Sequence, residues 1–130
     1  MAIPDDSPAA AIARLDAALA RRGQDVELQR VTGITSGLPT FASVTCRARV
    51  RNYTPAEVVQ GILHGESHVV LSPTEIIATA WTSGRPAGED TRVPMANNRL
   101  VIAGRARIIK AAVPFYMAGE LVRIELQVQG

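Results

Sequence analysis

Strict alternation of apolar and polar side chains in residues 122–128 constrains this chain more than any other feature. The apolar side chains recur there at every second position: Val122, Ile124, Leu126 and Val128. Successive side chains of a strand point to opposite faces, so this pattern predicts a strand with one face in a core and the other in water. Residues 41–51 repeat the pattern, with Ala42, Val44, Cys46, Ala48 and Val50 on the apolar face. Both stretches are typical of half-buried antiparallel strands.

The stretch 99–128 reads as three short strands separated by turns. Gly104 and Gly119 stand where the chain must turn, and Pro114 is expected to end the middle strand. Residues 25–31 alternate as well, and they predict a first strand with Val26 and Leu28 facing inward. These strands predict a small antiparallel β-barrel or sandwich.

Two helices are expected beside the strands. Residues 7–22 carry a narrow apolar stripe, with Ser7 as the N-terminal cap and Pro8 at the first helical position. Since this stripe is thin and rich in alanine, we expect the helix to lie outside the barrel or against a neighbouring subunit. The sequence Ser72-Pro-Thr-Glu75 has the capping-box pattern and predicts a short helix from Pro73 to about Ala80.

The predicted fold is therefore mainly β, of the α+β type. A chain of 130 residues is expected to form one domain, residues 1–130, with an N-terminal helical arm over 1–24 and a β-barrel over 25–130. One cysteine cannot form an internal disulfide. Residues 1–6 lack the features of a secretory signal, and no apolar run approaches the roughly 20 residues that span a bilayer. We expect a soluble protein made in the cytosol, without a membrane partner.

No residue pattern predicts catalysis, a metal site or a cofactor. His64 and His68 are the two histidines, and on a strand their spacing separates the Cα atoms by about 13 Å, too far for one ion. We interpret them as surface histidines in a loop. Cys46 falls on an apolar strand face and is expected to be a buried, unreactive thiol. Glu75 is accounted for by its helix cap. We therefore expect that the protein is not an enzyme.

Three arginines form the one patch with functional potential: Arg47, Arg49 and Arg51, on the polar face of one predicted strand. Guanidinium groups on one face suit contact with phosphates. The alternatives are a strand face kept soluble by its charges, or one that pairs with acidic groups of another subunit. The net charge is only +2, and five aromatic residues are too few for base stacking to be expected.

The order of these elements resembles the small β-barrel head–tail connector proteins of tailed bacteriophages, prophages and gene-transfer particles. The resemblance lies in the N-terminal helix, the arginine-bearing strand and three short segments: Leu71-Ser-Pro-Thr-Glu-Ile76, Leu100-Val-Ile-Ala-Gly104 and Gly119–Gly130. It covers about residues 25–130. Within that group the chain looks most like the head-completion or stopper protein, although a stopper need not carry such a well-formed N-terminal helix.

The resemblance implies a structural virion protein at the head–tail interface, assembled in the cytoplasm of the bacterial host. Its implied partners are other copies of itself in a ring, portal and adaptor proteins on the head side, tail-terminator or tail-tube proteins on the tail side, and genomic DNA bound without sequence specificity. Two long segments, residues 32–40 and 52–66, are the candidates to project into the DNA channel as loops. Their candidate channel residues are Gly33, Thr35, Ser36, Gly37, Gly61, His64 and Gly65.

Two other functions remain open from the sequence. Tail-terminator proteins are also small ring-forming α/β proteins, so the resemblance extends to them. A small nucleic-acid-binding β-barrel of the OB or SH3-like kind is the second alternative, and it would use the three arginines to bind DNA or RNA in a salt-dependent way.

Overall fold

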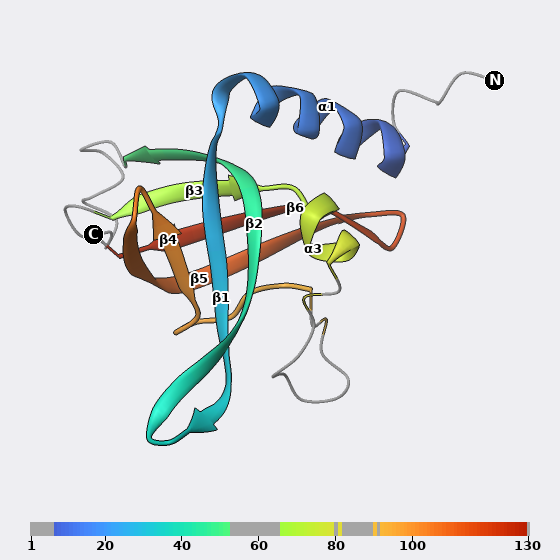
Figure 1. Cartoon of the computed structure of the whole chain (residues 1–130). Coiled ribbons are helices and arrows are strands. Elements are labelled where there is room, and N and C mark those ends of the chain that lie inside the picture. Colours follow the sequence, from blue (N-terminus) through green and yellow to red (C-terminus); the bar gives the residue numbers. More distant parts are fainter. Residues whose placement is uncertain (1–6, 53–65, 80, 82–89, 91, 130) are drawn as a thin grey trace.

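A computed structural model describes residues 7–52, 66–79, 81, 90 and 92–129 of the chain. Within these residues, six strands form one closed antiparallel barrel in the order β1-β2-β3-β6-β5-β4 (Figure 1). The strands are β1 (Gln24–Thr35), β2 (Leu38–Asn52), β3 (Ser67–Leu71), β4 (Arg99–Ile102), β5 (Arg105–Met117) and β6 (Glu120–Val128). The helices are α1 (Pro8–Arg22) and α3 (Thr74–Ala78). The prediction of a mainly β fold with two such helices is confirmed.

The core fills the inside of the barrel with the residues that alternation predicts. Val26 and Leu28 of β1 are buried there with Val44, Cys46 and Ala48 of β2. From β6 the core takes Ile124, Leu126 and Val128, and also Leu121. Val122 is buried but lies outside this core cluster, because the register between β5 and β6 shifts between Phe115 and Tyr116.

Three tight turns connect neighbouring strands with the same backbone geometry. In each turn a small residue and a glycine both take positive φ: Ser36-Gly37, Ala103-Gly104 and Ala118-Gly119. Two consecutive residues of positive φ define the hairpin turn whose twist matches that of the flanking strands. The predicted turns at Gly104 and Gly119 are confirmed.

Two sequence expectations about β-structure are wrong. Residues 32–40 are not a loop: β1 continues to Thr35, β2 begins at Leu38, and only Ser36 and Gly37 turn. The reason is that paired backbone groups and a glycine of positive φ allow this stretch, rich in Gly, Ser, Thr and Pro, to form a hairpin. Pro114 does not end its strand either, because β5 runs through it to Met117. A proline is tolerated at the edge of a sheet, because its nitrogen carries no N–H and no strand accepts a hydrogen bond there.

Helix α1 lies outside the barrel, as expected, and contacts β2 and β6 (Figure 1). The Ser7 side chain accepts a hydrogen bond from the Ala10 backbone nitrogen at 3.0 Å, which confirms it as the N-terminal cap. At the other end, Gly23 donates its backbone N–H to the carbonyl oxygen of Leu19. Neither helix in the described part of the chain is long and apolar enough to cross a membrane.

The short helix α3 begins one residue later and ends two residues earlier than expected. The Ser72 side chain accepts from the Thr74 backbone nitrogen at 3.2 Å, but Pro73 holds the N-terminal cap position without a side-chain hydrogen bond, so the predicted capping box is wrong. Glu75 was expected to complete the capping box, but its Oε2 is buried without a hydrogen-bond partner. Burial is the main reason that the pKa of Glu75 is raised.

Candidate functional site

Arg47, the first of the three predicted site arginines, fastens the end of α1 to the barrel. Its Nε donates to the carbonyl oxygen of Leu19 at 3.0 Å, and its Nη2 donates to that of Ala20 at 3.4 Å. Its Nη1 lies 3.3 Å from the Asp25 carboxylate. The last carbonyls of a helix lack partners within the helix and carry partial negative charge, so a guanidinium satisfies both needs there. Arg47 therefore stabilises the contact between the end of α1 and the barrel.

Arg49 and Arg51 lie together on the outer wall of the barrel. Arg49 is exposed, and Arg51 donates to the carbonyl oxygen of Asn52 at 3.4 Å. Strand pairing explains what surrounds them, because Arg49 is opposite Val70 of β3, and Arg51 is opposite His68. β3 in turn pairs with β6, which places Glu125 beside Val70. The neighbours of these arginines therefore come from strands far away in the sequence.

Two adjoining hollows on this wall are lined by arginines from β2 and from other elements as well. One has a volume of about 290 Å³ and lies between the last turns of α1 and the sheet; the other, of about 310 Å³, lies over β2, β3 and β6. Arg49, Val70 and Arg123 line both hollows. We call this surface the arginine face, and it comprises Arg21, Arg22, Arg49, Arg51 and Arg123. Guanidinium groups so arranged can bind phosphate or carboxylate groups.

One acidic side chain neutralises part of the arginine face. One oxygen of the Glu125 carboxylate lies 2.9 Å from Arg123 Nε, and the other oxygen lies 2.7 Å from His68 Nε2. The Arg123 guanidinium also lies 5.9 Å from the centre of the Phe115 ring. His68 is therefore a half-buried residue of β3, not a loop histidine. The strand pairing brings these groups together, and no spacing in the sequence shows it.

The hairpin formed by β1 and β2 extends beyond the rest of the barrel (Figure 1). Its predicted site residues divide between strand and turn: Gly33 and Thr35 belong to β1, whereas Ser36 and Gly37 form the turn. All residues from 31 to 40 are exposed, and none of them is charged. We call residues 31–40 the hairpin tip. The other predicted channel residues, Gly61, His64 and Gly65, lie outside the described residues.

The hairpin tip presents apolar side chains on both of its faces. Ile34 is opposite Pro39, so these two side chains share a face, and Val31 and Phe41 extend it toward the barrel. Leu38 points to the other face because it adjoins Pro39 in the strand. Ile34 is 76% exposed and Leu38 is 69% exposed. Two large apolar side chains are thus mostly exposed to water at the end of a projecting ribbon.

Arg30, at the base of this hairpin, is a fully buried arginine that the sequence analysis did not identify. Its Nη2 donates to the carbonyl oxygen of Val93 at 3.0 Å, and its Nε to Asn98 Oδ1 at 3.4 Å. Its guanidinium lies 4.1 Å from the centre of the Trp81 ring. The alternation that places Val26 and Leu28 inward also places Arg30 inward, and this signal was available in the sequence. Arg30 ties the segment before β4 to β1.

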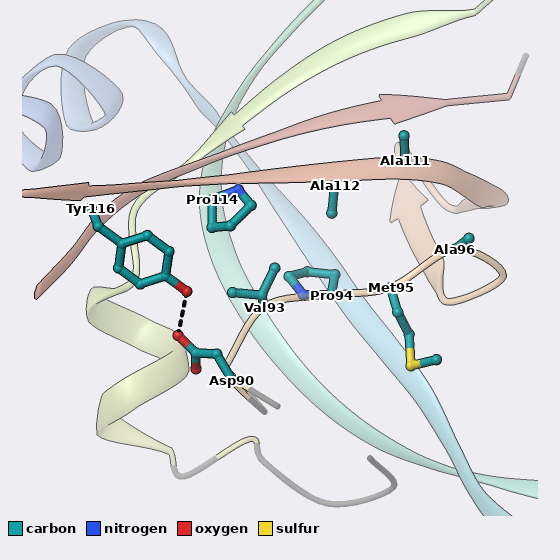
Figure 2. A pocket seen from close by; sticks show the side chains of 9 residues that line it. All are labelled: Asp90, Val93, Pro94, Met95, Ala96, Ala111, Ala112, Pro114 and Tyr116. Atoms are coloured by element: carbon teal, nitrogen blue, oxygen red, sulfur yellow. Dashed lines mark hydrogen bonds between the residues drawn. The ribbon is translucent and has the colours of Figure 1, made fainter. Parts of the chain in front are cut away.

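That segment forms one wall of an open groove of about 530 Å³, and β5 forms the other (Figure 2). The lining is mostly apolar: Val93, Pro94, Met95, Ala96, Ala111, Ala112 and Pro114, with Asp90 and Tyr116 at one end. The Tyr116 hydroxyl donates to Asp90 Oδ2 at 2.7 Å. Arg92 binds the same carboxylate with Nε and Nη2, both at 2.9 Å. The Arg92 hydrogen bond, with help from Tyr116, holds the pKa of Asp90 well below its usual range.

Cys46 and Glu66 are two further buried titratable groups of the described residues. Burial, with the nearby charge of Glu75, raises the pKa of the Cys46 thiol to about 12, so the thiol stays protonated. The buried Glu66 carboxylate accepts from Lys110 Nζ at 2.9 Å and from Gln127 Nε2 at 2.8 Å. In the described residues, no three His, Cys, Asp or Glu side chains are grouped to hold a metal ion.

Comparison with known proteins adds no family to this description. Neither the family models nor the curated proteins include a match to the chain.

Proposed function

We propose that the protein is a structural component of a tailed-phage particle or a related prophage or gene-transfer particle. In this role, copies of the chain form a ring around the DNA channel between the portal–adaptor complex and the tail. A stopper or head-completion protein is the first choice within this class, and a tail-terminator ring protein is the alternative.

The observation that carries this proposal is the uncharged hairpin tip with Ile34 and Leu38 exposed. Single exposed apolar side chains are ordinary on protein surfaces, but a projecting ribbon that carries several of them is typical of an interaction site. The three segments that resemble connector proteins fall on β3 and α3, on β4 with its turn, and on β6. Two of these strands lie next to the hairpin strands, because β3 pairs with β2 and β4 pairs with β1.

The test is assembly of the full chain. Native mass spectrometry and negative-stain microscopy are expected to show closed rings, either of the protein alone or after addition of the portal and adaptor proteins of the same particle. A protein that stays monomeric at high concentration and with both partners would refute the proposal.

The arginine face favours a second function, a small barrel that binds nucleic acid. Five guanidinium groups around two hollows suit the binding of phosphates, although one of the five, that of Arg123, is paired with Glu125. This function predicts DNA or RNA binding at low salt that weakens as salt rises. Replacing both Arg49 and Arg51 with alanine is expected to abolish that binding. Absence of binding by the unaltered chain at low salt would eliminate this alternative.

A further inference from the structure

The hairpin tip and the groove have matching chemistry on different parts of one chain. Apart from Asp90, every described residue that lines the groove is uncharged, and Asp90 is already bound by Arg92 and Tyr116. The hairpin tip carries no charge at all. Residues 31–40 contribute nothing to the lining of the groove. The groove and the hairpin tip are thus two separate apolar surfaces.

Each of the two surfaces also has two sides. The groove has two walls, one from residues 93–96 and one from β5 (Figure 2). The hairpin tip has two apolar faces, with Ile34 and Pro39 on one and Leu38 on the other. A ribbon that is apolar on both faces buries both of them only when it enters a site with two walls. A flat surface would leave Ile34 or Leu38 in water.

From these observations we infer that the hairpin tip of one copy inserts into the groove between residues 93–96 and β5 of the next copy. This inference rests on the proposed ring-forming function and identifies the contact between its subunits. Because the two surfaces are different, each copy can use its tip on one neighbour and its groove on another, and this arrangement is head to tail. Contacts of this kind generate closed rings when the rotation between copies closes.

Two other arrangements fit the surfaces less well. The groove edge of β5 over residues 111–117 pairs with no described strand, but Pro114 has no N–H to give to an added strand. Insertion of side chains is therefore favoured over addition of a strand. The outer face of β5 exposes Val113 and Phe115, yet it is flanked by the charged pair Arg123–Glu125. Burial of the hairpin tip there would desolvate those charges.

Cysteine cross-linking tests the contact directly. One version of the full chain carries Leu38→Cys and a second carries Met95→Cys, each with a different tag; both positions are exposed, and Cys46 is buried. When the two versions are produced in one cell, mild oxidation is expected to link them to each other. Each version produced alone is expected to give no linked species above the background of the unaltered chain.

Charge substitutions provide the second measurement. Ile34→Asp on the tip and Met95→Asp in the groove are each expected to weaken self-association by about ten-fold or more. Val113→Asp is the matched control, because it adds the same charge to an exposed apolar residue of β5 outside the groove lining. Circular dichroism checks that all three variants are folded.

The outcomes separate the contact from the function. Cross-links in the mixture would support the inference, provided that Ile34→Asp and Met95→Asp lose assembly and Val113→Asp keeps it. Rings that form without the cross-link, or that only Val113→Asp disrupts, would overturn the hairpin contact and leave the ring function standing. A chain that stays monomeric with portal and adaptor proteins and gives no cross-link would overturn both.

Discussion

Arg47 holds the last turn of α1 against the barrel, with its Nε 3.0 Å from the carbonyl oxygen of Leu19. The same guanidinium reaches Ala20 and Asp25. It therefore bridges the helix and the first two strands at the point where the chain passes from one to the other.

Replacing Arg47 with methionine is expected to lower the free energy of unfolding by about 1 kcal/mol, since the guanidinium is partly exposed and its hydrogen bonds are partly replaced by water. Arg49→Met is the matched control from the same strand face, and a change within about 0.5 kcal/mol is expected there. Urea denaturation measures both. Equal losses in the two variants would show that the helix does not depend on Arg47.

Arg30→Met tests the buried guanidinium beneath the hairpin. The substitution leaves the Val93 carbonyl without this donor and removes the contact with Trp81, so a loss of about 2–3 kcal/mol is expected. Arg99 lies 4.9 Å from the Phe41 ring and is only half-buried, so Arg99→Met is expected to cost less than about 1 kcal/mol. Fluorescence of Trp81, the single tryptophan, reports the unfolding of both variants.

The elements of the fold could be predicted from the sequence wherever alternation continued for several residues. Val44, Cys46 and Ala48 are buried because their spacing matches the strand period, and Ser7 caps α1 because its side chain suits that position. These features depend on neighbours in the chain. The length of the β1–β2 hairpin does not depend on them, because residues 32–40 are rich in Gly, Ser, Thr and Pro and become strand only through pairing with each other.

The surroundings of the candidate site could not be predicted for a related reason. Arg49 was identified from its strand, but Arg123 joins it only because β3 lies between β2 and β6. Strand order in a closed barrel is a property of the whole chain, and no local pattern records it. The groove is likewise lined by residues 93–96 and by β5, which β4 separates in the sequence.

Glycine is required at position 23 because no space is left for a side chain. Its backbone conformation is not the reason, since a φ of −94° is allowed for any residue. A Cβ atom there would lie 2.5 Å from the Leu19 carbonyl oxygen and 2.8 Å from that of Ala48, both backbone atoms. Gly23→Ala is therefore expected to destabilise the protein by about 1–3 kcal/mol through overpacking between α1 and β2. Gly33→Ala, whose new Cβ would meet only the Thr40 side chain at 3.5 Å, is the control. Thermal unfolding of both variants decides whether α1 depends on this close approach.

Ala103 occupies a turn position that suits asparagine better. Its φ of +51° is costly for alanine, whereas asparagine before glycine is favoured in this type of turn. Ala103→Asn is expected to raise the free energy of unfolding by about 0.5–1 kcal/mol. The same substitution at Ala106, an exposed residue of β5, is expected to give no gain. A gain at both positions would mean that the turn geometry is not the cause.

The groove contains the group with the clearest effect of pH on stability. Because Arg92 and Tyr116 hold the pKa of Asp90 below its ordinary value of 3.8, the folded state favours the ionised carboxylate. A group with a depressed pKa contributes stability above its unfolded pKa and loses that contribution as the pH falls toward its folded pKa. The free energy of unfolding is therefore expected to decline below about pH 4. Asp90→Asn is expected to lower stability at pH 7 and to flatten the decline below pH 4. Urea denaturation at pH 7, 4 and 2.5 measures both effects, and an unchanged slope in the variant would contradict the assignment to Asp90.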